Sequence, residues 1–229
     1  MPALFNPANL FGQPDRLARA RPPILLVIGA HREELSFGEV VAEHLDRQRI
    51  GLLRIPVGLS GQRPGPDGLE RYRQRHAELY RQILEHVQPG QRVLIDLHTG
   101  FDERQCSADV LCGEPALLRC IERKAAAEGR GSGGLGDMRP VRLIAADVET
   151  PPRSADARQT DAWPCVRPEL PESVWKGAGL LYIGIEVYLA EPSAGTTAGT
   201  PAEARFAAAV IDAVGECALT VQTARSRQG

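Results

Sequence analysis

Histidine and glutamate side chains follow two apolar segments of this sequence. His31 and Glu34 come directly after the apolar run 24–28, and His98 ends the largely apolar run 93–97. Apolar runs of this length are typical of buried strands, so all three side chains are expected at strand ends. Two histidines and one glutamate are a common ligand set of catalytic zinc, which keeps a further coordination position for water. The sequence therefore predicts a Zn²⁺ site at His31, Glu34 and His98.

The same residues have an interpretation without a metal. His31 could precede a helix whose acidic first turn, with Glu34, is favoured by the helix dipole. Polar groups that end two buried strands would, however, each cost about 1–3 kcal/mol if they were left unpaired. This cost favours a shared functional role for His31 and His98.

Asp96 is expected to support His98. Residues two apart in a strand point to the same face, so Asp96 and His98 project together. A carboxylate beside a metal-binding histidine fixes the orientation of the ring and the position of its proton. The alternative is that Asp96 caps a neighbouring helix or pairs with an arginine.

Glu186 is the lone carboxylate of the apolar segment 180–189. Strand alternation gives this segment one wholly apolar face and places Glu186 on the opposite face. A carboxylate inside a buried strand is costly unless it is paired or functional. Beside a zinc site its natural role is that of a general base, which takes a proton from the attacking water and returns it to the leaving amine. Pairing with a buried arginine is the alternative.

The surrounding segments alternate between expected strands and helices. This order predicts an α/β fold with a mixed, mainly parallel sheet and helices on both faces. Such sheets bind ligands beyond the carboxyl ends of their strands, where His31 and His98 fall. His76 lies on the apolar stripe of an expected helix and is interpreted as a hydrogen-bonded core residue. Strands are expected at 24–28, 52–57, 93–98, 108–112, 141–145 and 180–189, and helices at 36–49, 69–87, 115–128 and 202–219.

The length of 229 residues fits a single domain, 1–229. Residues 1–21 contain three prolines and are expected to be a loosely ordered lead-in. Residues 223–229 are expected to be a disordered tail. The segment 147–178 is rich in Pro and Asp and shows no period, so we expect a long loop there.

Composition and charge argue against several classes of protein. The net charge of −2 lacks the basic excess of a nucleic-acid binder. No stretch approaches the roughly 18 apolar residues of a membrane span or resembles a signal peptide, so a cytoplasmic protein without a membrane partner is expected. The five cysteines are interpreted as buried small side chains or free thiols. They are Cys106, Cys112, Cys120, Cys165 and Cys217.

The motifs together resemble the zinc carboxypeptidase superfamily. Gly-x-His-x-x-Glu at 29–34, Asp-Leu-His-Thr-Gly at 96–100 and the strand glutamate Glu186 carry the resemblance, which spans residues 24–189. The nearer branch is the succinylglutamate desuccinylase/aspartoacylase-like group, whose members act on small acyl-amino acids. This resemblance implies the same ligand set and the same catalytic glutamate that the residues themselves suggest.

Substrate binding is where the sequence departs from that family. Its members usually carry an Asn-Arg pair, between the two metal motifs, that grips a substrate carboxylate, and this chain has none. Arg54, on an expected strand, and Arg63, on the glycine-rich loop 58–68, are the available substitutes. Arginine suits this task because its planar guanidinium donates two parallel hydrogen bonds to a carboxylate. Arg63 is preferred because glycines would let its loop fold over the site. The alternative is that Arg63 is a solvated loop residue.

The sequence thus favours a zinc-dependent amide hydrolase that acts on a small molecule or short peptide with a carboxylate. One alternative is a non-catalytic metal- or ligand-binding protein with the same fold. Another is an α/β enzyme in which these residues are structural. The sequence leaves the oligomeric state open.

Overall fold

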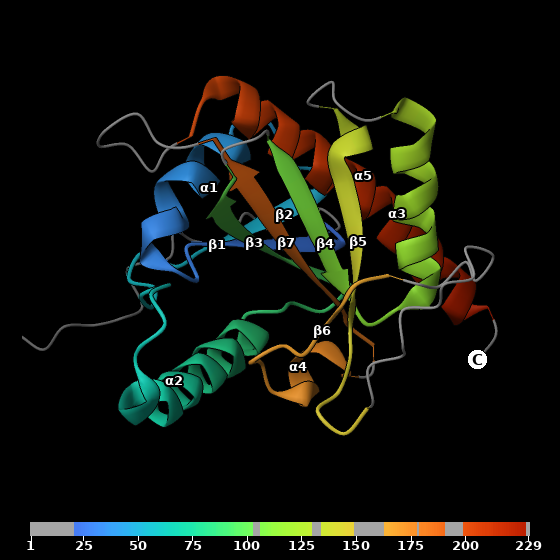
Figure 1. Ribbon diagram of the computed structural model, residues 1–229. Helices are drawn as coiled ribbons and strands as arrows, with labels where there is room; N and C mark the ends of the chain where they lie inside the picture. The colour runs from blue at the N-terminus through green and yellow to red at the C-terminus, as the bar shows by residue number, and fades with distance from the viewer. Residues whose placement is uncertain are drawn as a thin grey trace, which may run out of the picture.

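The computed structural model describes residues 21–102, 106–129, 134–148, 163–177, 179–190 and 199–227. These residues form a seven-stranded sheet with the order β2-β1-β3-β7-β4-β5-β6 (Figure 1). Every neighbouring pair is parallel except β7 with β4. The predicted mixed, mainly parallel sheet is confirmed. Its strands are β1 (Ile24–Ile28), β2 (Ile50–Arg54), β3 (Val93–Phe101), β4 (Ser107–Cys112), β5 (Met138–Leu143), β6 (Cys165–Val166) and β7 (Leu181–Leu189).

Helices cover both faces of this sheet, as predicted. One face packs against α1 (Leu35–Ala42), α3 (Pro115–Glu128) and α5 (Pro201–Ser226), and the other against α2 (Pro66–Glu85) and α4 (Glu172–Trp175) (Figure 1). Strand β1 is apolar throughout because alternate residues enter the two opposite cores. Two single 3-10 turns, Arg32–Glu34 and Leu135–Asp137, complete the described elements.

Two expected irregular segments contain regular structure. Helix α5 begins at a capping box formed by Thr200 and Glu203 and continues through Ser226, so the expected disorder from 223 onward is wrong for residues 223–226. Part of the expected long loop, 163–177, holds β6 and α4. The rest of that loop, 149–162, and the expected lead-in at 1–20 lie outside the described residues.

The cysteine prediction is wrong for one pair. Cys120 on α3 and Cys217 on α5 form a disulfide between residues 97 apart in the sequence. The bond connects two helices on the same face of the sheet, a contact that cysteine spacing along the chain does not reveal. Cys106, Cys112 and Cys165 are free thiols, as expected.

The carboxyl ends of β1, β3 and β7 lie at one edge of the sheet because these three strands are mutually parallel. Gly29 follows β1 with a φ of +79°, and a Cβ atom there would lie only 2.7 Å from the carbonyl oxygen of Ile55. Only glycine fits this turn without strain, and the turn brings the next residues over the strand ends. No helix among the described residues is both long enough and apolar enough to cross a membrane.

Candidate metal centre

Three side chains converge at this edge of the sheet. His31 ends the turn after β1, Glu34 lies in the following 3-10 turn, and His98 projects from β3. One donor atom from each lies within 4.8 Å of the others. The carboxylate of Glu34 bridges the two rings, with Oε1 at 3.0 Å from His31 Nδ1 and Oε2 at 3.1 Å from His98 Nδ1. The structure therefore brings the predicted ligands together, and their binding of a metal stays a prediction.

The second ring nitrogen of His98 is held by a buried carboxylate. Its Nε2 lies 2.9 Å from Asp96 Oδ2, and Asp96 is completely buried. Tyr80 of α2 and Tyr182 of β7 donate their hydroxyl groups to the same oxygen, the latter at 3.1 Å. These contacts favour a proton on His98 Nε2 and leave Nδ1 directed at Glu34. Asp96 thus takes the orienting position that the sequence predicts for it.

The metal-free cluster resembles an ion-pair network. Burial lowers the pKa of His98, but the charge and hydrogen bond of Asp96, followed by Glu34, outweigh it and hold that pKa well above the usual value. Burial raises the pKa of Glu34, but its hydrogen bonds to His31 and His98 outweigh burial and lower it. A proton on His98 Nδ1 therefore occupies the position where a cation would bind. Metal binding would displace this proton, because imidazole coordinates only in its neutral form.

The proton of His31 is positioned by His76, a residue that sequence reasoning assigned to the core. His76 is buried, and its Nδ1 lies 3.0 Å from the carbonyl oxygen of Tyr72. Since a carbonyl only accepts, His76 Nδ1 carries a proton and Nε2 is an acceptor in the neutral ring. Burial lowers the pKa of His76 and so favours that neutral form. His31 Nε2, at 3.2 Å from His76 Nε2, then donates, and Nδ1, which faces Glu34 Oε1, is the nitrogen that a metal would bind.

Replacing His76 by Leu should weaken zinc binding about 10–100-fold, because the partner that fixes the His31 ring is removed. His76→Gln should retain much of the affinity, since its amide oxygen can still accept from His31 Nε2. Competition with a chromophoric chelator measures both affinities, and thermal unfolding of the metal-free proteins controls for folding. Unchanged zinc affinity in a folded His76→Leu protein would contradict this role.

The residues that sequence reasoning missed lie on one side of α2. Tyr72, His76 and Tyr80 are spaced four apart, and each has a polar tip on an otherwise apolar stripe. Two hydroxyl groups and one imidazole on successive turns indicate that this face of the helix packs over polar groups. The spacing of these residues along the helix does not reveal that α2 packs against Asp96 and His98 of β3.

Glu186 lies directly beside His98 in the sheet. The two residues are partners in the parallel pairing of β3 with β7, and therefore project from the same face. Burial raises the pKa of Glu186, and this effect outweighs that of the nearby His98, which lowers it; Glu34 and His31 have smaller, opposing effects. No arginine of the described residues forms an ion pair with Glu186, so the alternative of a structural pair has no support there. A carboxyl group with a raised pKa beside a metal site suits a proton shuttle.

A cavity of about 230 Å³, here called the metal pocket, joins these groups. His31, His98 and Glu186 line one part of it. The remaining wall is largely apolar and aromatic, with Tyr182 of β7 among its members. That wall also includes Tyr72, Leu111, Leu143, Val166 and Leu170.

The two predicted substrate-binding arginines already have carboxylate partners. Arg54 donates through Nε to both carboxylate oxygens of Glu39, at 2.7 and 2.9 Å. Arg63 pairs with Glu169, a residue at the wall of the metal pocket. Neither arginine lines that pocket itself. Their role in binding a substrate carboxylate stays a prediction, and the structure gives each guanidinium another partner.

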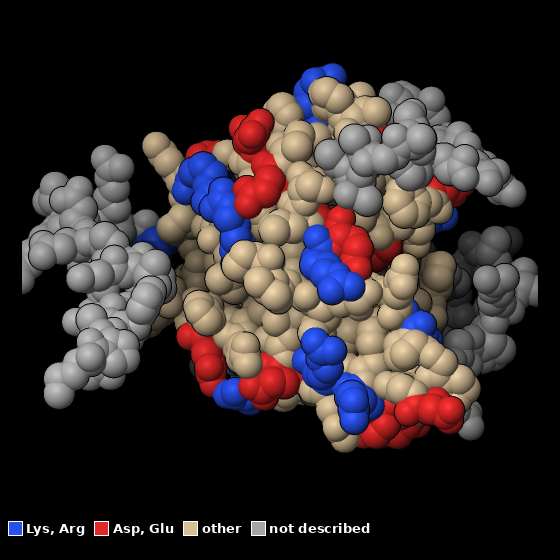
Figure 2. All heavy atoms as spheres, turned by 90° about the vertical axis from the view of Figure 1, so that its left-hand side faces the viewer, with Lys and Arg blue, Asp and Glu red and all other residues tan. Residues whose placement is uncertain are grey.

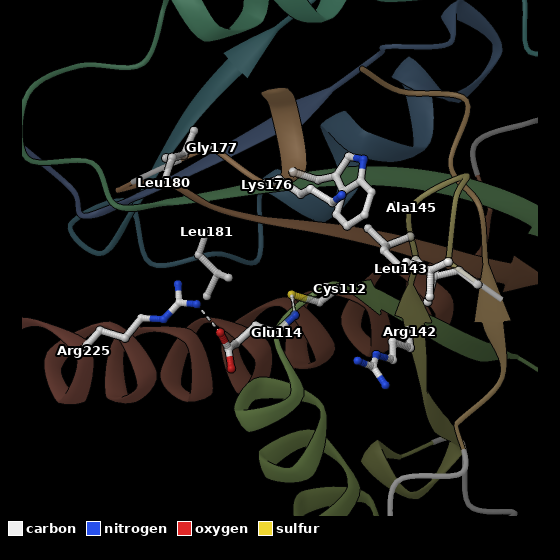
Figure 3. A pocket seen from close by; sticks show the side chains of 14 residues that line it. Cys112, Glu114, Arg142, Leu143, Ala145, Lys176, Gly177, Leu180, Leu181 and Arg225 are labelled. Atoms are coloured by element: carbon white, nitrogen blue, oxygen red, sulfur yellow. Dashed lines mark hydrogen bonds and ion pairs between the residues drawn. The ribbon is translucent and has the colours of Figure 1, made fainter. Parts of the chain in front are cut away.

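Another large cavity of the described structure lies elsewhere on the molecule. A cavity of about 340 Å³ is bordered by Cys112, Arg142, Lys176 and the Glu114–Arg225 ion pair (Figure 3). Within the described part of the chain, the group at His31, Glu34 and His98 is the one that brings three metal-binding side chains together. Acidic and basic side chains are interspersed over the face of the molecule seen in Figure 2.

This chain is similar to known proteins in structure only. No protein-family model matches the sequence, and a search of curated proteins finds no match. The fold is similar to that of the CwlD amidase from Clostridioides difficile, solved in complex with the GerS lipoprotein, at 8% identity and a TM-score of 0.45 over 86% of this chain and 98% of that one. It is also similar to a metallo-carboxypeptidase from Burkholderia cenocepacia, at 15% identity and a TM-score of 0.43 over 93% of this chain.

Murine aminoacylase 3 is a third similar structure, at 12% identity and a TM-score of 0.45 over 87% of this chain. The chain spans 60% of the length of the carboxypeptidase and 66% of that of the aminoacylase. Sequence identity and structural agreement with all three proteins are low. The function proposed below therefore rests on the side chains of the metal centre.

Proposed function

We propose that this chain is a zinc-dependent hydrolase that cleaves an amide bond of a small N-acyl amino acid or short peptide. One observation carries the proposal: two histidines whose Nδ1 atoms face the same carboxylate lie beside a strand glutamate that has no ion-pair partner among the described residues. Two imidazoles and one carboxylate fit zinc, and this set is typical of catalytic rather than structural sites. His31, Glu34 and His98 would hold the metal.

Bound zinc would supply a Lewis acid that polarises the scissile carbonyl and makes a water molecule more acidic. Glu186 would accept the proton of the attacking water and deliver it to the leaving amine. Asp96 and His76 would hold the two histidine rings in the required orientation. The apolar wall of the metal pocket would exclude bulk water and strengthen the electrostatic interactions of these groups.

The disulfide bears on where such an enzyme would work. Disulfides persist in oxidising compartments and are rare in the cytosol of mesophiles. The Cys120–Cys217 bond therefore favours an oxidising compartment over the cytoplasmic location expected from the sequence. The proposal is accordingly for an enzyme that acts where this bond is maintained.

Metal content and turnover test this function together. We expect one zinc per chain by mass spectrometry of purified protein, and hydrolysis of a panel of N-acyl amino acids detected by release of the free amine. Removal of zinc with a chelator should abolish turnover, and added zinc should restore it. Protein that binds zinc at this site but cleaves no member of the panel would instead be the non-catalytic binding protein. Protein that binds no zinc would contradict both assignments.

A further inference from the structure

A second cavity adjoins the metal pocket. It measures about 280 Å³ and lies between the beginning of α2 and the segment 59–64. Tyr72 and His76 line both cavities, so these two side chains form a shared wall. Because His76 also contacts the predicted ligand His31, the second cavity lies next to the metal centre, on the other side of this wall.

Two arginines give this second cavity, here called the arginine cavity, its charge. Arg71 and Arg75 both line it, and no Asp or Glu does. Neither arginine forms an ion pair with any residue in the described ranges, whereas the nearby Arg63, Arg73 and Arg81 all do. Like charges four apart on a helix repel each other. An anion bound between Arg71 and Arg75 would remove this repulsion.

The surroundings of these arginines do not neutralise them. On their other side they border a shallower hollow, where the carboxylate of Glu78 is already paired with Arg81. The first turn of α2 also borders the arginine cavity at Gly68. The amide groups of that turn carry the positive end of the helix dipole, which adds to the attraction for an anion.

We propose that the arginine cavity binds the carboxylate of the substrate, while the metal pocket takes its apolar acyl group. This inference rests on the proposed amide hydrolase function and names the substrate class: an N-acyl amino acid with an apolar acyl group and a free carboxylate. Arginine binds carboxylates through paired hydrogen bonds, and Arg71 and Arg75 are free to form them. Arg54 and Arg63, the residues expected from the sequence, are instead engaged by Glu39 and Glu169.

Direct binding tests this assignment without turnover. The zinc-loaded full chain carrying Glu186→Gln is titrated by calorimetry with N-benzoylglycine, N-benzoyl-β-alanine and N-benzoyl-γ-aminobutyrate. These probes differ in the distance between amide and carboxylate, and each is paired with its primary amide. We expect at least one acid to bind more tightly than its amide. Adding Arg71→Gln and Arg75→Gln together should reduce that acid's affinity about 10–100-fold and leave the amide's affinity unchanged.

Arg73→Gln, in the same background, is the matched control: Arg73 lies on the same helix, pairs with Glu169 and lines neither cavity, so its replacement should leave the preference for the acid intact. Equal affinity for acids and amides, no binding of any probe, or loss of the preference in Arg73→Gln alone would overturn the proposal. The unaltered enzyme separates the two proposals. An arginine-dependent preference for acids without hydrolysis would support carboxylate binding in the arginine cavity and contradict the hydrolase function. Hydrolysis without that preference would support the hydrolase function and contradict carboxylate binding in this cavity.

Discussion

Zinc binding should be lost when either histidine of the metal centre is replaced by alanine, but only one replacement should also weaken the fold. His31→Ala removes a ligand whose other contact is the neutral ring of His76. His98→Ala leaves the carboxylate of Asp96 buried without its imidazolium partner. Removal of one partner of a buried ion pair typically costs about 3–5 kcal/mol. The metal-free His98→Ala protein should therefore unfold at distinctly lower denaturant concentration than metal-free His31→Ala.

Equilibrium zinc titration and urea unfolding of the metal-free proteins measure these two effects separately. His44 is exposed on the surface, and His44→Ala is the control for general loss of a histidine. It should change neither zinc affinity nor stability. If His31→Ala and His44→Ala both retained stoichiometric zinc, the metal could not be held by the predicted ligands. If His98→Ala were as stable as His31→Ala, the Asp96–His98 pair would not contribute to folding as inferred.

Glu186→Gln should reduce kcat by about 10²–10⁴-fold while zinc remains bound. The amide side chain has nearly the same size, so folding and the pairing of β7 with β3 should persist. It cannot accept a proton at neutral pH, so the water is no longer activated and the leaving amine is no longer protonated. The measurement is kcat on the best N-acyl amino acid of the panel, together with zinc content.

Glu216→Gln is the matched control for this substitution. Glu216 is exposed on α5 and pairs with Lys124, so its replacement should leave turnover unchanged. Full activity of zinc-loaded Glu186→Gln would assign the proton transfer to another group. Loss of zinc from that protein would show that Glu186 acts on the metal rather than on the water.

The sequence predicts the strand ends of this site well because the relevant signals are local. A short apolar run that ends in a histidine or contains one carboxylate is visible without knowledge of the fold. The parallel arrangement of β1, β3 and β7 then follows from the alternation of strands and helices, and it brings His31, His98 and Glu186 to one edge.

The supporting residues come from contacts between distant segments. His76 reaches His31 only because α2 packs across the ends of the strands, and Tyr80 reaches Asp96 for the same reason. Arg63 is engaged by Glu169, which lies in a segment without periodicity. The disulfide likewise depends on the packing of α3 against α5. Local patterns carry no information about such pairings, and the prediction for these residues was incomplete or wrong for that reason.

The position of β7 has a consequence for how the chain folds during synthesis. Strands β3 and β4 are consecutive in the sequence, yet they are not neighbours, because β7 lies between them. Until β7 leaves the ribosome, β3 and β4 each present an unpaired edge to the cell, and unpaired edges promote association with other chains. His31, Glu34 and His98 all emerge before β7 does, so the nascent protein exposes its metal ligands ahead of Glu186. The two halves of the sheet can therefore join only after β7 has been synthesised, and the long separation in sequence between β3 and β7 is expected to slow this pairing.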